Sequence, residues 1–96
     1  MNELLTLIKR TWENGEHRES VRTVFCGVRS VRYREFYASY ATDYHPELVF
    51  VLADYLDYDG ETLAEYQGQR YRILRTYRTG LALELTAERA PREEEE

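Results

Sequence analysis

Apolar and polar residues alternate over Tyr71–Ala87, near the C-terminal end of the chain. Such alternation is typical of strands with one buried face. A three-residue loop of 78–80, with Gly80 left-handed, gives a mostly apolar face that pairs Tyr77 with Leu81, Arg75 with Leu83, Ile73 with Leu85 and Tyr71 with Ala87. A two-residue loop would set Tyr71 and Ile73 opposite a glutamate and a threonine. Because register follows the hydrophobic pattern, the sequence predicts the three-residue loop.

Two earlier apolar segments predict further strands. Val21–Val31 is rich in β-branched residues and places Val24, Cys26 and Val28 on one face. Leu48–Leu52 is an uninterrupted apolar run, which is typical of a strand covered on both sides. The polar stretch 57–60, DYDG, is expected to turn the chain into the next strand. Several short strands joined by turns indicate a small β-barrel or sandwich.

The N-terminal segment LLTLIKRTW fits two patterns. Leu4, Leu5, Ile8 and Trp12 fit one helical face, whereas Leu5 and Leu7 alternate as in a strand. The polar stretch that follows, ENGEHRES (13–20), is predicted to be a loop. The residues alone leave the choice between helix and strand open.

One segment in the middle of the chain has helical spacing. Tyr33, Phe36, Tyr37 and Tyr40 recur as they would on one face of a helix. Ser30 is a suitable cap, and the His45-Pro46 step would end the helix, because the residue before proline avoids the helical region. The pattern predicts a short helix over Tyr33–Thr42, inside an insertion that runs from Val31 to Glu47.

Length and charge limit what the chain can be. Its 96 residues fit one domain, expected over 1–90. The formal net charge is −5, and four glutamates against Arg92 place much of it in 91–96, which is expected to be a disordered acidic tail. The rest is nearly neutral. A free-standing duplex binder usually has a strong basic excess, so that class is disfavoured.

Arginine is concentrated in the predicted hairpin. A possible contact surface there consists of Arg70, Arg72, Arg75, Tyr77 and Arg78. A tight turn at Gln67-Gly68 would set Glu65 opposite Arg70. Cross-strand charge pairs contribute only about 0.2–1 kcal/mol each, but they weaken the case for nucleic acid. A charge-matched sheet surface is therefore favoured, and a nucleic-acid-binding module that uses this Tyr/Arg hairpin is the alternative.

No catalytic, metal or cofactor template is complete. Cys26 is the only cysteine and lies in an apolar run, which favours a buried thiol over a reactive one. His17 and His45 lie in separate polar stretches without metal-ligand spacing. The aspartates before Gly60 fit a calcium loop poorly, because tyrosine would occupy positions one and twelve. We expect no enzymatic activity, no metal, no cofactor and no membrane association.

Four segments follow one another along most of the chain: ELLTLI, RTVFCGVRSVRYREFY, HPELVFVLADYLDYDGE and YQGQRYRILRTYRTGLALEL. Their order resembles the head-closure proteins of long-tailed bacteriophages, also called stopper or head–tail joining proteins. The resemblance implies a small β-barrel with an N-terminal strand and a long insertion between its second and third strands, here Val31 to Glu47. Relatives commonly carry glycines in that insertion, whereas ASYATDYHPE has none.

The resemblance also implies a function. Such proteins form a ring below the portal and adaptor proteins, close the channel after DNA packaging and offer a platform to the tail. The implied channel-closing or inter-subunit residues are Tyr33, Arg34, Phe36, Tyr37, Tyr40, Tyr44 and His45. The implied partners are further copies of the chain, the portal or adaptor protein, a tail-completion protein, and DNA that passes without sequence-specific binding. The expected location is the virion, after synthesis in the bacterial cytoplasm.

Overall fold

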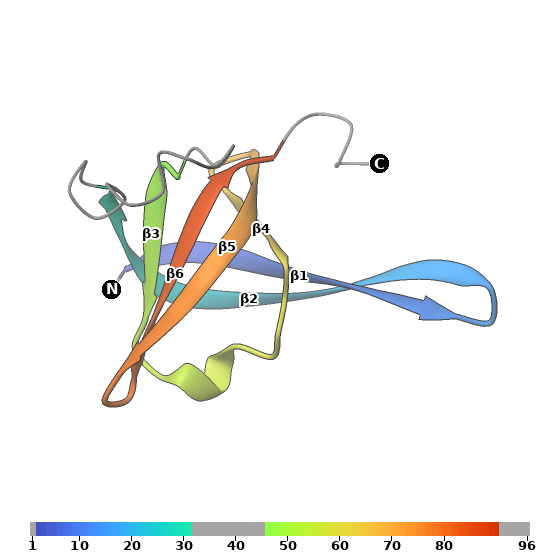
Figure 1. Cartoon of the computed structure of the whole chain (residues 1–96), viewed down its shortest axis with the longest axis horizontal. Helices are drawn as coiled ribbons and strands as arrows, with labels where there is room; N and C mark the ends of the chain where they lie inside the picture. The colour runs from blue at the N-terminus through green and yellow to red at the C-terminus, as the bar shows by residue number, and fades with distance from the viewer. Residues whose placement is uncertain (1, 32–45, 91–96) are drawn as a thin grey trace.

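The computed structural model describes residues 2–31 and 46–90, which form a closed antiparallel β-barrel with the strand order β1-β2-β3-β6-β5-β4 (Figure 1). The strands are β1 (Glu3–Glu13), β2 (Glu16–Ser30), β3 (Leu48–Leu52), β4 (Leu63–Tyr66), β5 (Gln69–Thr79) and β6 (Ala82–Arg89), and one 3-10 turn, η2 (Tyr55–Asp57), follows β3. The predicted mainly β fold and the barrel are confirmed. The helix predicted over Tyr33–Thr42 and the tail 91–96 lie outside the described residues.

Aromatic and aliphatic side chains from all six strands fill the barrel. Phe50 is fully buried and makes edge-to-face contacts with Tyr66 and Tyr71, with ring centroids 5.5 and 5.6 Å away. The inward face predicted for β2 is confirmed, because Cys26 is buried and Val24 and Val28 pack against the core. Burying one such aliphatic side chain contributes roughly 1.5–3 kcal/mol, so this interior accounts for the closed shape.

The N-terminal segment is a strand and not a helix. Leu5 and Leu7 are fully buried. Leu4, which directly precedes Leu5 in β1, is exposed, as the alternation of a strand requires. The loop predicted over 13–20 is wrong. Asn14 and Gly15 have φ of 52° and 79°, the values of a type I′ hairpin turn, and β1 and β2 stay paired up to Glu13 and Glu16. The polarity of this stretch reflects solvent on both faces of a two-stranded ribbon.

The turn predicted at Gln67-Gly68 is confirmed. Both residues have positive φ, 51° and 79°, and Tyr66 pairs with Gln69 across the turn. Glu65 lies opposite Arg70, as predicted.

The predicted register of the last hairpin is wrong. Thr79 pairs with Ala82, so the loop is the two residues Gly80 and Leu81. Gly80 does have positive φ, 61°, as expected for the first position of a tight hairpin turn. A β-bulge at Leu74 separates the pair Ile73–Ala87 from the pair Arg75–Thr86.

The bulge changes the face to which odd-numbered residues of β5 point. Tyr71 and Ile73 face the core. Arg75 pairs with Thr86, whose neighbours Leu85 and Ala87 point inward, so Arg75 points outward. A regular alternation cannot predict this change, because one extra residue inverts the pleat.

The two ends of the insertion meet at the barrel wall. β2 and β3 are paired up to Ser30 and Leu48. The next step is a hydrogen bond of 3.0 Å from the Val31 amide to the Glu47 carbonyl. Strand pairing therefore continues to the first and last residues of the predicted insertion.

Candidate functional site

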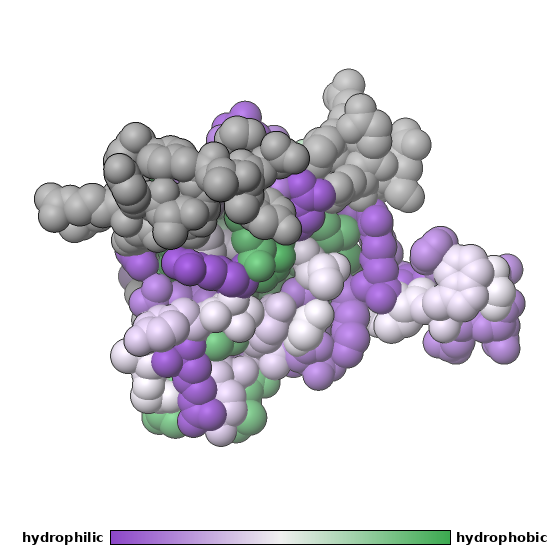
Figure 2. Space-filling model, viewed as in Figure 1, coloured by the Kyte–Doolittle hydropathy of each residue, from purple (hydrophilic) through white to green (hydrophobic). Residues whose placement is uncertain are grey.

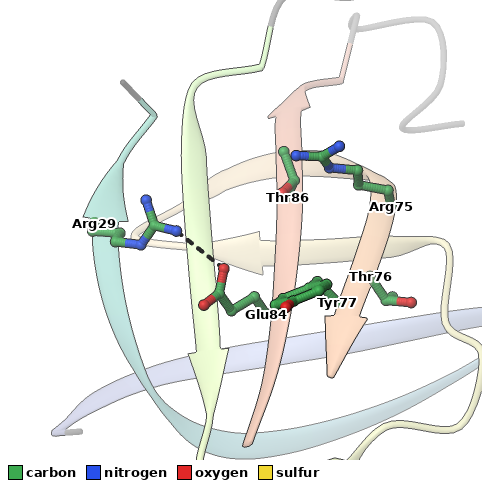
Figure 3. A pocket seen from close by; sticks show the side chains of 6 residues that line it. All are labelled: Arg29, Arg75, Thr76, Tyr77, Glu84 and Thr86. Carbon is green, nitrogen blue, oxygen red and sulfur yellow. Dashed lines mark hydrogen bonds and ion pairs between the residues drawn. The ribbon is translucent and has the colours of Figure 1, made fainter. Parts of the chain in front are cut away.

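An open groove of about 430 Å³ lies on the outer wall of the barrel, over β6. It is lined by Arg29, Arg75, Thr76, Tyr77, Glu84 and Thr86. Figure 3 shows the Tyr77 ring and the Arg75 guanidinium lying over β6, whereas Thr76 points away from it. This volume falls within the usual range of ligand pockets.

Strand register explains why these side chains converge. Arg29, Val49, Thr86 and Arg75 occupy one row across β2, β3, β6 and β5. Val51, Glu84 and Tyr77 occupy the adjacent outward row. Only the bulge at Leu74 brings Arg75 and Tyr77 to this side of β5.

The groove has a mixed but net basic lining. Arg29 Nη2 donates to Glu84 Oε1 at 3.0 Å across β3. Two arginines and one glutamate lie along the lining. Tyr77 adds an exposed aromatic surface, with 63% of the residue accessible. Arginine and tyrosine are enriched at protein interfaces.

The other hairpin arginines are held by partners within the chain. The carboxylate of Glu19 accepts from Arg70 Nη1 at 3.3 Å. Arg72 Nε donates to Glu88 at 2.9 Å, and its Nη2 donates to the same carboxylate. Both arginines are therefore charge-matched within the chain, as the sequence analysis favoured.

Arg78 lies at the end of the barrel near η2. Its guanidinium carbon is 3.5 Å from the centroid of the Tyr55 ring, and its Nε donates to the Gly80 carbonyl at 2.9 Å. The Tyr55 ring in turn packs against the core. Arg78 therefore covers an aromatic residue that closes this end of the barrel.

A second exposed feature is the ribbon end, defined as residues 10–22 of β1 and β2. It extends from the barrel in Figure 1, and Figure 2 shows mostly hydrophilic surface there. Trp12 is 64% exposed and contacts His17 edge-to-face at 4.2 Å between ring centroids. At its tip, Glu13 lies directly opposite Glu16. Like charges in this arrangement repel each other.

Ion pairs fix the base of the ribbon end to the barrel. Arg10 and Arg70 both reach Glu19, at 3.0 and 3.3 Å. These hydrogen bonds, that of Arg70 first, lower the pKa of the Glu19 carboxyl. On the other face, Arg22 Nη2 donates to the Asp57 carbonyl at 2.6 Å and to buried Glu61 at 3.1 Å.

The titratable groups offer no reactive centre in the described part of the chain. Burial, with a smaller effect of Glu3, raises the pKa of the Cys26 thiol to about 11. Within 2–31 and 46–90, no three His, Cys, Asp or Glu side chains are placed to hold a metal ion. His17 contacts Trp12 in the ribbon end. It lies in strand β2, whereas the sequence predicted a loop.

Seven predicted residues lie outside the described ranges, namely Tyr33, Arg34, Phe36, Tyr37, Tyr40, Tyr44 and His45. The sequence analysis missed the groove residues Arg29, Glu84 and Thr86, because a correct register of β5 and β6 was needed to find them. It also missed the ribbon end, although Asn-Gly between two runs that can pair is a strong hairpin signal.

No protein-family model matches the chain, and no curated protein matches it. In the described residues, no helix has the length and apolar character needed to cross a membrane.

Proposed function

We propose that this chain is a structural protein of a phage or prophage head–tail connector. Copies of it form a ring that closes the portal channel after DNA packaging and gives the tail a surface on which to attach. The portal or adaptor protein binds one side of the ring and a tail-completion protein the other.

The observation that carries the proposal is the hydrogen bond from the Val31 amide to the Glu47 carbonyl. A barrel that closes through its described strands is a scaffold from which the segment between Val31 and Glu47 can act. A ring subunit that closes a channel requires both parts, a barrel for assembly and a separate segment for closure. The aromatic insertion residues Tyr33, Phe36, Tyr37 and Tyr40 supply the contact surface.

Two further features support assembly over catalysis. The groove over β6 and the ribbon end are unlike surfaces, and a head-to-tail ring needs two unlike surfaces that fit each other. Without its acidic tail, the chain is nearly neutral. This charge suits a channel wall along which DNA moves, because non-specific DNA binding is driven by Lys and Arg that neutralise phosphates.

The alternative function is a nucleic-acid-binding module that stacks bases on Tyr77 and contacts phosphate through Arg75. Arg70 and Arg72 weigh against it, because glutamates already occupy their guanidinium groups. Titration of single-stranded DNA at several salt concentrations separates the two functions. Tight binding whose affinity falls steeply with salt favours the module, and weak binding favours the connector.

The experiment that tests the connector function replaces residues 33–45 with a short Gly-Ser linker. The barrel should remain folded, because the linker has only to join two hydrogen-bonded residues. Virions made with this variant should contain the chain and lose DNA from filled heads. Thermal unfolding and genome retention are the two measurements.

A full-length variant with Tyr33, Tyr37 and Tyr40 changed to Ser is the matched control, since it keeps the length and removes the aromatic surface. The gene should also lie beside those of a portal and a major capsid protein. Filled heads that retain DNA with the linker variant, or absence of the chain from virions, would refute the connector function.

A further inference from the structure

We propose that two copies of this chain join through the free edge of β2, defined as residues 17–25, to form one antiparallel sheet of four strands. The strand order across the contact is β1, β2, β2 of the second copy and β1 of the second copy. The contact goes beyond the proposed function and does not depend on it. It joins two identical edges, so it closes as a pair with two-fold symmetry and not as a ring.

The edge is free because β2 is longer than one of its neighbours. β1 pairs with β2 over the whole stretch from Glu16 to Cys26, whereas β3 pairs with β2 only from Gly27 to Ser30. β1 and β3 are the neighbours of β2 in the barrel, and Figure 1 shows β2 extending from the barrel together with β1. Within 2–31 and 46–90, one side of β2 over 17–25 therefore has no strand beside it.

The backbone groups on this side are known from the next part of β2. The Val31 amide donates to the Glu47 carbonyl, on the side of β3. Amide and carbonyl groups change sides with every residue of a regular strand, and the pairing of β2 is regular from Glu16 to Ser30. The odd-numbered residues of the edge therefore direct both groups outward, namely His17, Glu19, Val21, Thr23 and Phe25.

These outward groups are available to another strand. None of the five residues takes part in a backbone hydrogen bond with a turn or loop in the described part of the chain, and all five are exposed. A row of backbone donors and acceptors without strand partners is a template for strand pairing. The occupant that it recognises is an extended strand.

Exposed apolar side chains line one face of the sheet beside this edge. Leu4 lies directly opposite Phe25, and the two residues are 57% and 64% exposed. Val21 at 61% and Trp12 at 64% lie on the same face. A two-stranded ribbon is marginally stable in water, whereas three or more strands with an apolar face can be stable. A second ribbon supplies these strands and gives the exposed residues apolar neighbours across the contact.

One antiparallel register of β2 with itself fits the sequence of the edge. Because outward groups must meet outward groups, odd residues pair with odd residues. With Val21 opposite Val21 of the second copy, Glu19 lies opposite Thr23 and His17 lies opposite Phe25. No two like charges are directly opposite in this register.

The neighbouring registers are unfavourable. Registers centred on Arg18, Glu19 or Arg22 place that charged residue opposite itself, and the register between the first two of these centres and Val21 that is centred on position 20 places Arg18 opposite Arg22. Like charges directly opposite each other are destabilising. A register centred on Thr23 would place Glu19 beside Gly27, where β3 already lies.

The balance of charge along the edge supports a second copy as the occupant. Glu16 and Glu19 alternate with Arg18 and Arg22, so neither a strongly acidic nor a strongly basic strand is favoured. A copy of the same edge has the same length, the same balance and a register without like-charged pairs. The contact therefore needs no sequence other than this one.

The register also joins the apolar residues of the two ribbons. Trp12 contacts His17 edge-to-face at 4.2 Å between ring centroids. His17 lies opposite Phe25 of the second copy in this register, and that Phe25 lies opposite its own Leu4. Three aromatic rings and one leucine thus form a continuous row across four strands, and two-fold symmetry repeats the row.

The first test measures self-association of the purified full-length chain by sedimentation velocity up to about 1 mM, the range of a weak contact. We expect a dimer as the largest species. Val21→Lys places two cations opposite each other at the two-fold axis and should weaken dimerisation at least tenfold. Leu81→Lys is the matched control, because Leu81 is 68% exposed but lies between β5 and β6. It should dimerise like the unchanged chain.

Charge exchange at the same position makes the test specific. Val21→Lys and Val21→Glu should each weaken dimerisation, because each sets like charges opposite each other. Mixed in equal amounts, the two variants should form a heterodimer, since opposite charges then meet at the axis. Thermal unfolding of every variant shows that the barrel is intact.

A disulfide tests the register. The Cα atoms of a hydrogen-bonded antiparallel pair are about 5.5 Å apart, which a disulfide can span. Val21→Cys should therefore form a covalent dimer on mild oxidation. Thr23→Cys is the control on the same face, because the two copies of residue 23 lie four residues apart along the strands, or roughly 13 Å, and should not link. The buried Cys26 does not compete.

Four outcomes would overturn the contact: a monomer at about 1 mM, equal effects of Leu81→Lys and Val21→Lys, no heterodimer on mixing, or equal linking by Thr23→Cys and Val21→Cys. These measurements read association of the free chain. Genome retention can therefore fail while this contact stands, and this contact can fail while the chain still closes the channel.

Discussion

Arg72 and Glu88 lie directly opposite each other on β5 and β6, and Arg72 Nε donates to the Glu88 carboxylate at 2.9 Å. Glu88 is only 4% exposed, so its charge depends on partners within the protein. We expect Arg72→Met to lower the free energy of unfolding by about 1–3 kcal/mol, the cost of a buried polar group that loses its partner. Urea unfolding measures the change.

The double variant Arg72→Met with Glu88→Leu is the control for this pair. Replacing both charged groups by apolar ones removes the desolvation penalty, so the double variant should be more stable than Arg72→Met alone. If the single variant were the more stable of the two, the ion pair would not be what holds Glu88.

The ionisation of Glu19 makes the local stability of the ribbon end depend on pH. Its pKa is lowered below the ordinary value of 4.5, first by the hydrogen bond from Arg70 and then by that from Arg10. A lowered folded-state pKa adds stability that is present above the unfolded value and is lost as pH falls through the folded value. Amide exchange in Lys9–Glu13 should therefore speed up between about pH 5 and pH 3, as measured by NMR after correction for intrinsic rates.

Glu19→Gln should show the same fast exchange already at neutral pH, with little loss of global stability, because exposed ion pairs contribute about 0–1 kcal/mol. Glu16→Gln, which changes the tip and not the base, should keep the slow exchange at neutral pH. Equal effects of the two variants would mean that the ion pairs at the base do not fix the ribbon end.

The Cys26 thiol should be inert in the native protein. Burial raises its pKa to about 11, so at pH 8 roughly one molecule in a thousand carries the thiolate that reacts. Alkylation followed by mass spectrometry should show no labelling of the folded chain and full labelling in guanidinium chloride. Labelling should rise as pH approaches 11. Rapid native labelling at pH 8 would show that this face of β2 opens.

Gln67 offers a stabilising substitution. It has φ of 51° in the turn between β4 and β5, a conformation that asparagine and glycine accept better than glutamine. Gln67→Asn should raise the free energy of unfolding by about 0.5–1 kcal/mol, which corresponds to roughly 2–8 °C in Tm at this size. Gly68→Ala, with φ of 79° at the next position, should lower Tm. A lower Tm for Gln67→Asn would contradict the assigned turn.

Sequence reasoning succeeded where side-chain pattern and turn chemistry agreed. The apolar run of β3 and the inward row of Val24, Cys26 and Val28 followed from hydrophobicity alone. The turn at Gln67-Gly68 combined a glycine with two flanking strands and was correct. The pairing of these elements is regular.

It failed where local polarity or an irregular strand decided the outcome. The ribbon end is exposed on both faces, so it carries no alternation to read, and only Asn14-Gly15 signals its turn. In the last hairpin, one regular register was fitted to a strand that contains a bulge. The groove could not be predicted for the same reason, because its residues converge only after that bulge is known.

The bulge at Leu74 also sets how this segment tolerates changes in length. Removing Leu74 itself would leave a regular strand in which Arg75 still pairs with Thr86 and points outward. Removing Thr76, beyond the bulge, would instead bring Arg75 or Tyr77 to the inward phase of Tyr71 and Ile73. Most substitutions at the exposed positions 75–79 are mild by comparison. Between Val31 and Glu47 the opposite holds, since a change of length there leaves the pairing of Ser30 with Leu48 in place and shifts no pleat of β2 or β3. Single-residue deletions beyond the bulge in β5 should therefore be destabilising, whereas deletions at Leu74 and in the insertion should be tolerated, whatever each segment contacts.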